Sequence, residues 1–137
     1  MATLVFDQEY RIARDTPSDI NEHIEVLKNL ADSVEHVTEM GTRTGVSTRA
    51  FLAADVTLRA YDLFLDEYVS QLFELAQKEG KDAKYIEANV LETEIDETDL
   101  LFIDTWHCYD QLYAELTKHA PKVKKYIAFH DTQTYGT

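Results

Sequence analysis

Several short apolar runs of this chain end in polar side chains that could bind a ligand or transfer a proton. These side chains are Glu39, Asp62, Asn89, Asp104, His130 and Asp131. Carboxylate and amide oxygens accept hydrogen bonds from hydroxyl and amino groups, and an imidazole exchanges a proton near neutral pH. If the runs are parallel strands, their carboxyl ends meet at one edge of a sheet, where α/β proteins bind ligands. We therefore predict a ligand site at that edge.

The stretch "EMGTRTGVST" (39–48) holds two of the four glycines, Gly41 and Gly45. Glycine permits positive φ and lets a ligand approach the backbone amides at the start of a following helix. Asp62 lies 21 positions after Gly41, where an acid that binds ribose hydroxyls is expected. The glycines alone are also consistent with a tight turn. Together with Asp62 they predict a nucleotide-type ligand.

A second group of side chains could hold a metal ion or accept a proton. Asp104, His130 and Asp131 are predicted to end neighbouring strands, and their ligand atoms suit Mg²⁺ or Mn²⁺, and Zn²⁺ or Fe²⁺ as well. The alternative is that His130 packs or hydrogen-bonds while Asp131 caps a turn. His107 follows Asp104 by three positions and is a candidate general base or a cap of the next helix.

The elements that must position these residues alternate between strand and helix. The apolar patterns predict strands over 34–40, 57–63, 83–90, 99–104 and 124–131. They predict helices over 16–33, 46–54, 66–80 and 109–121, with Thr16 and Ser47 as caps, Pro17 in a first turn and Gly80 as a stop. Such alternation implies right-handed crossovers and a parallel sheet covered on both faces. The fold class is α/β, in a single domain over 1–137.

Composition restricts the setting and the partners. The net charge of −13 repels phosphate backbones, so we expect no nucleic acid, whereas a cationic small molecule or a divalent metal would be attracted. No apolar run approaches the roughly 20 residues that span a bilayer, and the first residues lack signal-peptide features. Cys108 is the only cysteine and cannot form an internal disulfide. We expect a cytoplasmic protein that does not bind membranes.

The pattern Glu39-x-Gly41-x-x-x-Gly45 resembles the first motif of class I S-adenosylmethionine (SAM)-dependent methyltransferases. Asp62 resembles their ribose-binding acid, and "EANVLE" resembles the third motif, which borders the adenine. "LLFIDTWHCYDQL" and "KKYIAFHDT" resemble later motifs of the cephalosporin hydroxylase and macrocin O-methyltransferase group. The resemblance extends from about Ser33 to Gly136.

The resemblance implies a Rossmann-like three-layer sandwich with strand order 3-2-1-4-5, over 34–137, preceded by a helical segment over 1–33. It implies SAM as the cofactor and methyl transfer to the hydroxyl of a small molecule or sugar, assisted by Mg²⁺ or Mn²⁺. The cofactor-binding residues would be Glu39, Gly41, Thr42, Arg43, Gly45, Asp62, Asn89 and Asp104. The catalytic residues would be His107 and Asp104, and the metal ligands Asp104, His130 and Asp131.

Three features depart from that family. Arg43 replaces the central glycine of the first motif, which would narrow the loop or turn the side chain outward, and Asn89 replaces an acid. The chain stops at Thr137, soon after the fifth predicted strand, so the C-terminal part of the family is expected to be missing. The last strand would then be an exposed apolar edge, and we expect a homo-oligomer joined through residues 125–130.

Two other functions are consistent with parts of the pattern. A shortened methyltransferase fold could serve as a SAM- or nucleotide-binding or assembly protein without turnover. A dinucleotide-dependent oxidoreductase is disfavoured, because the glycines are spaced G-x-x-x-G rather than G-x-G-x-x-G. The chain is also short for a separate substrate domain.

Overall fold

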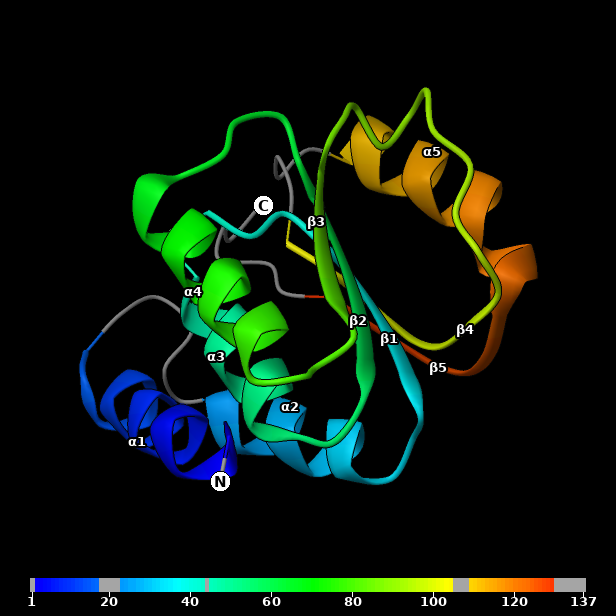
Figure 1. Cartoon of the computed structure of the whole chain (residues 1–137). Helices are drawn as coiled ribbons and strands as arrows, with labels where there is room; N and C mark the ends of the chain where they lie inside the picture. Colours follow the sequence, from blue (N-terminus) through cyan, green and yellow to red (C-terminus); the bar gives the residue numbers. More distant parts are fainter. Residues whose placement is uncertain (1, 18–22, 44, 105–108, 130–137) are drawn as a thin grey trace.

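The computed structural model describes residues 2–17, 23–43, 45–104 and 109–129, and contains one all-parallel sheet of five strands (Figure 1). The strands lie in the order β3-β2-β1-β4-β5. Their bounds are β1 (His36–Met40), β2 (Thr57–Asp62), β3 (Ala83–Glu87), β4 (Thr98–Ile103) and β5 (Val123–Phe129). The predicted α/β class, parallel sheet and strand order are confirmed.

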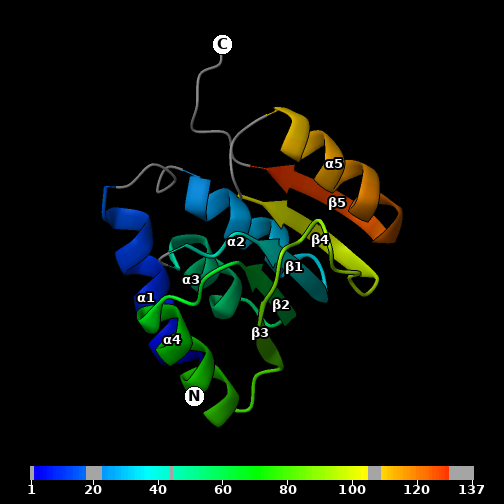
Figure 2. The same ribbon diagram turned by 90° about the horizontal axis from the view of Figure 1, so that it is seen from above.

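Helices cover both faces of this sheet. They are α1 (Ala2–Asp15), α2 (Ile24–Asp32), α3 (Val46–Ala53), α4 (Glu67–Lys78) and α5 (Tyr109–His119), and a short 3₁₀ turn, η2 (Ala120–Lys122), follows α5. Figures 1 and 2 show α1 to α4 on one side of the sheet and α5 on the other. No helix of the described ranges is long and apolar enough to span a bilayer.

The sheet separates two apolar clusters, because successive side chains along each strand point to opposite faces of the sheet. Phe102 and Leu58 belong to the larger cluster, beneath α2, α3 and α4, and Phe51 of α3 meets Phe102 edge to face at 5.8 Å. Met40 and Leu101 belong to the smaller cluster, beneath α5. All residues of the inner strand β4, which lies between β1 and β5, are buried, so this strand is covered on both faces.

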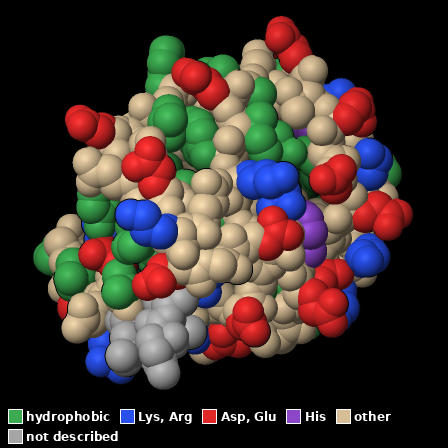
Figure 3. All heavy atoms as spheres, in the orientation of Figure 1, with side chains coloured by type: hydrophobic (Ala, Val, Ile, Leu, Met, Phe, Trp, Pro, Cys, Tyr) green, Lys and Arg blue, Asp and Glu red, His purple; other side chains and the backbone are tan. Residues whose placement is uncertain are grey.

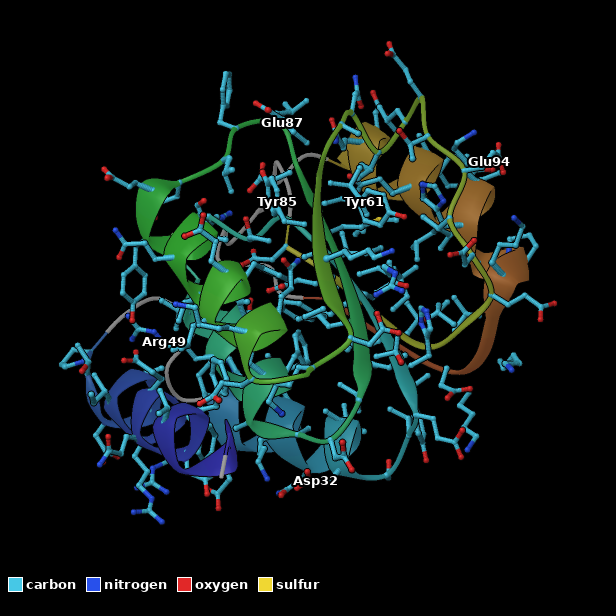
Figure 4. All side chains as sticks on the ribbon, in the orientation of Figure 1. Asp32, Arg49, Tyr61, Tyr85, Glu87 and Glu94 are labelled. Carbon is cyan, nitrogen blue, oxygen red and sulfur yellow. The ribbon has the colours of Figure 1, made fainter. Side chains whose placement is uncertain are left out.

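The N-terminal helix α1 is fastened to the rest of the molecule by Arg49 of α3 (Figure 4). Nε of Arg49 lies 3.4 Å from Oε1 of Glu9, and the Arg49 guanidinium lies 4.8 Å from the centre of the Tyr68 ring. The Tyr68 hydroxyl donates to the same Glu9 carboxylate. This cluster joins α1, α3 and α4, and Phe6 of α1 is fully buried beneath it in the core.

The helix predicted over 16–33 is confirmed over α2 (Ile24–Asp32), but its predicted start at Thr16 was wrong. The Thr16 amide donates to the Ile12 carbonyl at 2.9 Å, so Thr16 closes α1 rather than capping the next helix. Pro17 directly follows, and the described part of the next helix begins at Ile24 after His23. Helix α1 was not predicted as a separate element.

Candidate functional site

Three of the described residues in the loop between β1 and α3 have positive φ. Gly41 and Gly45 each have φ near 90°, and Arg43 has φ near 50°. The Gly41 amide donates to the Tyr61 carbonyl at 2.7 Å, and the Gly45 amide donates to the Thr42 carbonyl at 2.8 Å. These bonds hold the loop against the end of β2 and close a tight turn before α3.

Gly45 is required by packing as well as by conformation. A Cβ atom at this position would lie 3.1 Å from Cγ2 of Val69 and 3.2 Å from Cδ1 of Leu72, both on α4. Gly45 is also the N-cap residue of α3, a place that the sequence had suggested for Ser47. The second glycine of the loop therefore lets α4 pack closely over the start of α3.

Asp62 at the end of β2 binds the loop directly. Its Oδ2 accepts hydrogen bonds from the Arg43 amide at 2.9 Å and from Oγ1 of Thr42 at 3.2 Å. Its Oδ1 accepts from the Leu63 amide at 2.7 Å. The structure thus brings together the acid and the glycine loop, which the sequence had linked only by spacing.

The Arg43 side chain turns toward the end of β4 instead of outward. Its Nη2 lies 3.4 Å from Oδ1 of Asp104. The Asp104 side chain is only 6% exposed, whereas that of Arg43 is 43% exposed. The Asp104 amide donates to the Met40 carbonyl at 2.7 Å, which fixes its backbone beside β1. Arg43 therefore contacts two of the predicted site acids, Asp62 through its backbone and Asp104 through its side chain.

Glu39 is fully buried and faces α3. Its carboxyl group accepts hydrogen bonds from the hydroxyls of Ser47, at 2.5 Å, and Thr48, at 2.8 Å. Burial raises the pKa of Glu39 to about 8, although both hydrogen bonds oppose the shift. The nearby carboxyls of Asp104 and Asp62 contribute to this rise in the pKa. Glu39 thus ties β1 to the first turn of α3 behind the loop.

Ser47 and Thr48 were not predicted from the sequence as partners of Glu39. The available signal was a pair of adjacent hydroxyls in the first turn of the helix after the loop. A buried carboxyl at the end of a central strand needs such donors.

Asn89 lies two residues beyond the end of β3, because this strand stops at Glu87 rather than at the predicted 90. Its Oδ1 accepts from the Leu91 amide at 2.9 Å, and its backbone carbonyl accepts from the Glu92 amide at 2.9 Å. The side chain therefore stabilises a turn after β3 in the manner typical of asparagine.

Apolar side chains line the loop that follows Asp62. Leu63, Phe64 and Leu65 are exposed, and Phe64 is 80% exposed. The loop crosses the top of the molecule in Figure 1, and Figure 3 shows hydrophobic side chains gathered near the top of the same view. The Tyr85 hydroxyl donates to the Phe64 carbonyl at 2.9 Å, so β3 supports the apolar rim formed by residues 63–65. Burial and the carboxyls of Asp62 and Glu87 raise the pKa of Tyr85 to about 12, so its hydroxyl stays protonated and can donate this hydrogen bond.

Three predicted site residues, His107, His130 and Asp131, lie outside the described residues. Among the residues that are described, no group of three His, Cys, Asp or Glu side chains is arranged to hold a metal ion. Asp104 is the one predicted metal ligand that the structure places.

Comparisons with known proteins match the fold to that of methyltransferases. No family model matches the chain, and no curated protein matches its sequence. A SAM-dependent methyltransferase from Clostridium acetobutylicum superposes with a TM-score of 0.65 over 97% of this chain, at 14% identity. The N-methyltransferase NodS from Bradyrhizobium japonicum, bound to S-adenosylhomocysteine (SAH), gives a TM-score of 0.63 over 90% of this chain, at 14% identity.

A Staphylococcus aureus protein assigned as a caffeoyl-CoA O-methyltransferase shares 21% identity over 90% of this chain, with a TM-score of 0.60. The chain spans 62% of that protein, 68% of NodS and 57% of the Clostridium protein. At these identities the likeness shows the fold, which is the Rossmann-like fold of SAM-dependent methyltransferases. The cephalosporin hydroxylase and macrocin O-methyltransferase subgroup is not among these neighbours.

Proposed function

We propose that this chain binds SAM at the loop over residues 41–45 and transfers the methyl group to a hydroxyl of a small molecule. The observation that carries the proposal is the position of Asp62, which ends β2 and lies against the glycine loop. In open parallel sheets this edge, near the reversal of strand order, binds ligands. The fold shared with SAM-dependent methyltransferases supports the same donor.

The described residues offer groups that fit a nucleoside. The carboxylate of Asp62 can accept hydrogen bonds from ribose hydroxyls, and Gly41 leaves space for close approach to the backbone. The exposed rim over 63–65 is apolar, as one face of an adenine requires. Asn89 lies in the turn after β3, and we propose that its amide borders the adenine from there.

SAM supplies an electrophilic methyl group on a sulfonium. When the acceptor oxygen bonds to this methyl group, the carbon–sulfur bond breaks, its electron pair stays on sulfur, and SAH is released. The acceptor hydroxyl must also lose its proton, and we propose His107 as the base and Asp104, at the end of β4, as the second catalytic residue. The protein otherwise acts by holding donor and acceptor in line.

The narrower assignments are also proposals. They rest on the sequence motifs over 100–132 and place the chain in the cephalosporin hydroxylase and macrocin O-methyltransferase group, with an O-methyl product. In this proposal a divalent ion, Mg²⁺ or Mn²⁺, would bind Asp104, His130 and Asp131 and orient the acceptor oxygen.

Titration calorimetry with SAM and SAH tests the donor site. We expect both to bind, and we expect Asp62→Asn to weaken SAH binding by about 10- to 100-fold, because a charged acceptor of two ribose hydroxyls becomes a neutral amide. Asp66→Asn is the matched control. Asp66 caps α4 through the Tyr68 and Val69 amides in the same loop region, and asparagine caps helices equally well.

Absence of binding by SAM and SAH at millimolar concentration would contradict the proposed donor. Repeating the titrations with Mn²⁺ and with a chelator tests the metal assignment. Transfer of a labelled methyl group to hydroxyl acceptors then separates an enzyme from a binding protein without turnover, which would bind SAH and release no label.

A further inference from the structure

Tyr85 of β3 connects the core of the molecule to the apolar rim over 63–65. Its ring packs against the larger apolar cluster and lies 6.0 Å from the Phe73 ring of α4 (Figure 4). Its hydroxyl extends beyond that contact and donates to the Phe64 carbonyl at 2.9 Å. A side chain that is fixed by packing at one end therefore holds the backbone of an exposed loop at the other.

The middle of the rim depends on this hydrogen bond. All three rim side chains are exposed, so packing contributes little to holding them in place. At one end Asp62 accepts from the Leu63 amide, and at the other end Asp66 caps α4. Among the described residues, the Tyr85 hydroxyl is the only group that hydrogen-bonds to the backbone of the other two rim residues. Without it the rim would be held only at its ends.

We propose that Tyr85 is a positioning residue for the nucleoside half of the donor, and that its hydroxyl holds Phe64 where the Phe64 ring can cover the adenine. This inference rests on the proposed function, which places the adenine against the rim. Tyr85 does not touch the ligand in this arrangement and acts through the backbone of Phe64. The ligand then meets a rim that is already ordered, so less chain entropy is lost on binding.

The surroundings of Tyr85 keep its hydroxyl protonated and place it beside the ribose acid. Burial and the carboxyls of Asp62 and Glu87 raise the pKa of Tyr85 to about 12, and hydrogen bonding with the Thr42 side chain opposes this rise only in part. Thr42 in turn donates to Asp62. Strands β2 and β3 pair with Ala60 opposite Tyr85 and Asp62 opposite Glu87. Strand β3 therefore supports the rim and flanks the ribose acid at the same time.

Limited proteolysis tests the contact between Tyr85 and the rim without any ligand. Chymotrypsin cleaves after phenylalanine and leucine, which are the residues of the rim. We expect Tyr85→Phe, which removes only the hydroxyl, to raise the rate of cleavage within 63–65 about 2- to 10-fold, because one hydrogen bond no longer opposes local opening. Tyr68→Phe is the matched control, because it removes a hydroxyl that donates to Glu9 of α1, and it should leave this rate unchanged. Mass spectrometry of the fragments measures both rates.

Titration calorimetry with SAH and 5′-methylthioadenosine tests the role of Tyr85 in binding. Both ligands carry adenosine, and only SAH carries the amino-acid chain. Tyr85→Phe should weaken both by the same factor, about 2- to 10-fold, and Tyr68→Phe should weaken neither. In a Phe64→Ala background, Tyr85→Phe should no longer change either affinity, because the ring that Tyr85 positions is gone. Thermal melting by circular dichroism confirms that each variant folds.

The outcomes distinguish this proposal from the one on which it rests. Equal cleavage of the rim in Tyr85→Phe and in the unaltered protein would overturn the proposal, whether or not the ligands bind. A loss of affinity for SAH alone, or an undiminished loss in the Phe64→Ala background, would overturn the action through Phe64 and leave the donor site intact. Failure of the unaltered protein to bind either ligand would remove the proposed function, and with it the role of Tyr85 in binding.

Discussion

Glu39 is an acid held inside the molecule where an ionised carboxylate is unfavourable. Its pKa rises from an ordinary value of 4.5 to about 8 because the group is buried. Between these values the folded chain therefore holds one more proton than the unfolded chain. The free energy of unfolding should fall as pH rises through this window, by on the order of 1 kcal/mol per pH unit from this residue.

Glu39→Gln isolates that contribution, because glutamine cannot ionise and still hydrogen-bonds to Ser47 and Thr48. Urea unfolding at several pH values between 5 and 8.5 measures it. The free energy of unfolding of the unaltered protein, minus that of the variant, should decline steadily as pH rises. Burial also lowers the pKa of His36 and His119, an effect of opposite sign that is common to both proteins and cancels. A flat difference would show that Glu39 is ionised in the fold.

The residues of the site could be predicted from the sequence, but the directions in which their side chains point could not. Asp62 and the two glycines follow from a spacing that nucleotide-type ligands impose, and the structure brings them together. The inward direction of Glu39 depends on two hydroxyls that become its neighbours only when α3 packs on β1. The direction of Arg43 depends on a positive φ that no pattern of residue types encodes.

At the scale of elements, Gly45 controls how closely α4 approaches α3. Gly45→Ala should lower the free energy of unfolding by about 2–4 kcal/mol, because a Cβ atom meets two α4 side chains in addition to the strain of positive φ. Gly80→Ala is the matched control. Gly80 also has positive φ, but its Cβ would have no neighbour within 4 Å, so the loss should be only about 1 kcal/mol.

Chemical denaturation of the two variants measures the difference between them. Equal losses would show that α4 moves away from Gly45 at little cost, and that only the backbone conformation requires a glycine there. A larger loss at Gly45 assigns the excess to contact with Val69 and Leu72.

The strands could be predicted within a few residues, because apolar runs with β-branched residues are short and separated by helices of clear period. The start of the chain was harder to predict. The order Thr16, Pro17, Asp19 has the pattern of a helix start, so the first helix was predicted to begin at Thr16, and α1 before it was not predicted. The structure shows α1 as a separate helix that is anchored by tertiary contacts, with Phe6 and Ala13 buried. Such contacts do not appear in a local pattern.

At the scale of the whole molecule, β5 is the most exposed strand. Within the described residues it pairs only with β4, and Tyr126, Ile127 and Phe129 are exposed. An apolar edge strand favours pairing with another chain. We propose that two copies associate through this strand, as expected from the sequence for residues 125–130.

Phe129→Lys should shift the protein toward the monomer, because a charge on the pairing edge opposes association. Light scattering at micromolar concentration measures the change. Ile12→Lys is the matched control, since Ile12 is 53% exposed on α1 and Phe129 is 52% exposed on β5. A monomeric unaltered protein, or equal effects of the two substitutions, would contradict association through β5.

The strand order also implies a sequence of folding events. His36 of β1 pairs with Thr57 of β2, which is close along the chain, whereas Val37 pairs with Leu100 of β4, which is distant. Closing the shorter segment costs less chain entropy, so the β1-α3-β2 unit should form early and β4 should dock later. The contact between the loop and Asp62 then forms in the first step. The contact between Arg43 and Asp104 must wait for the second, so the two halves of the site should mature at different times.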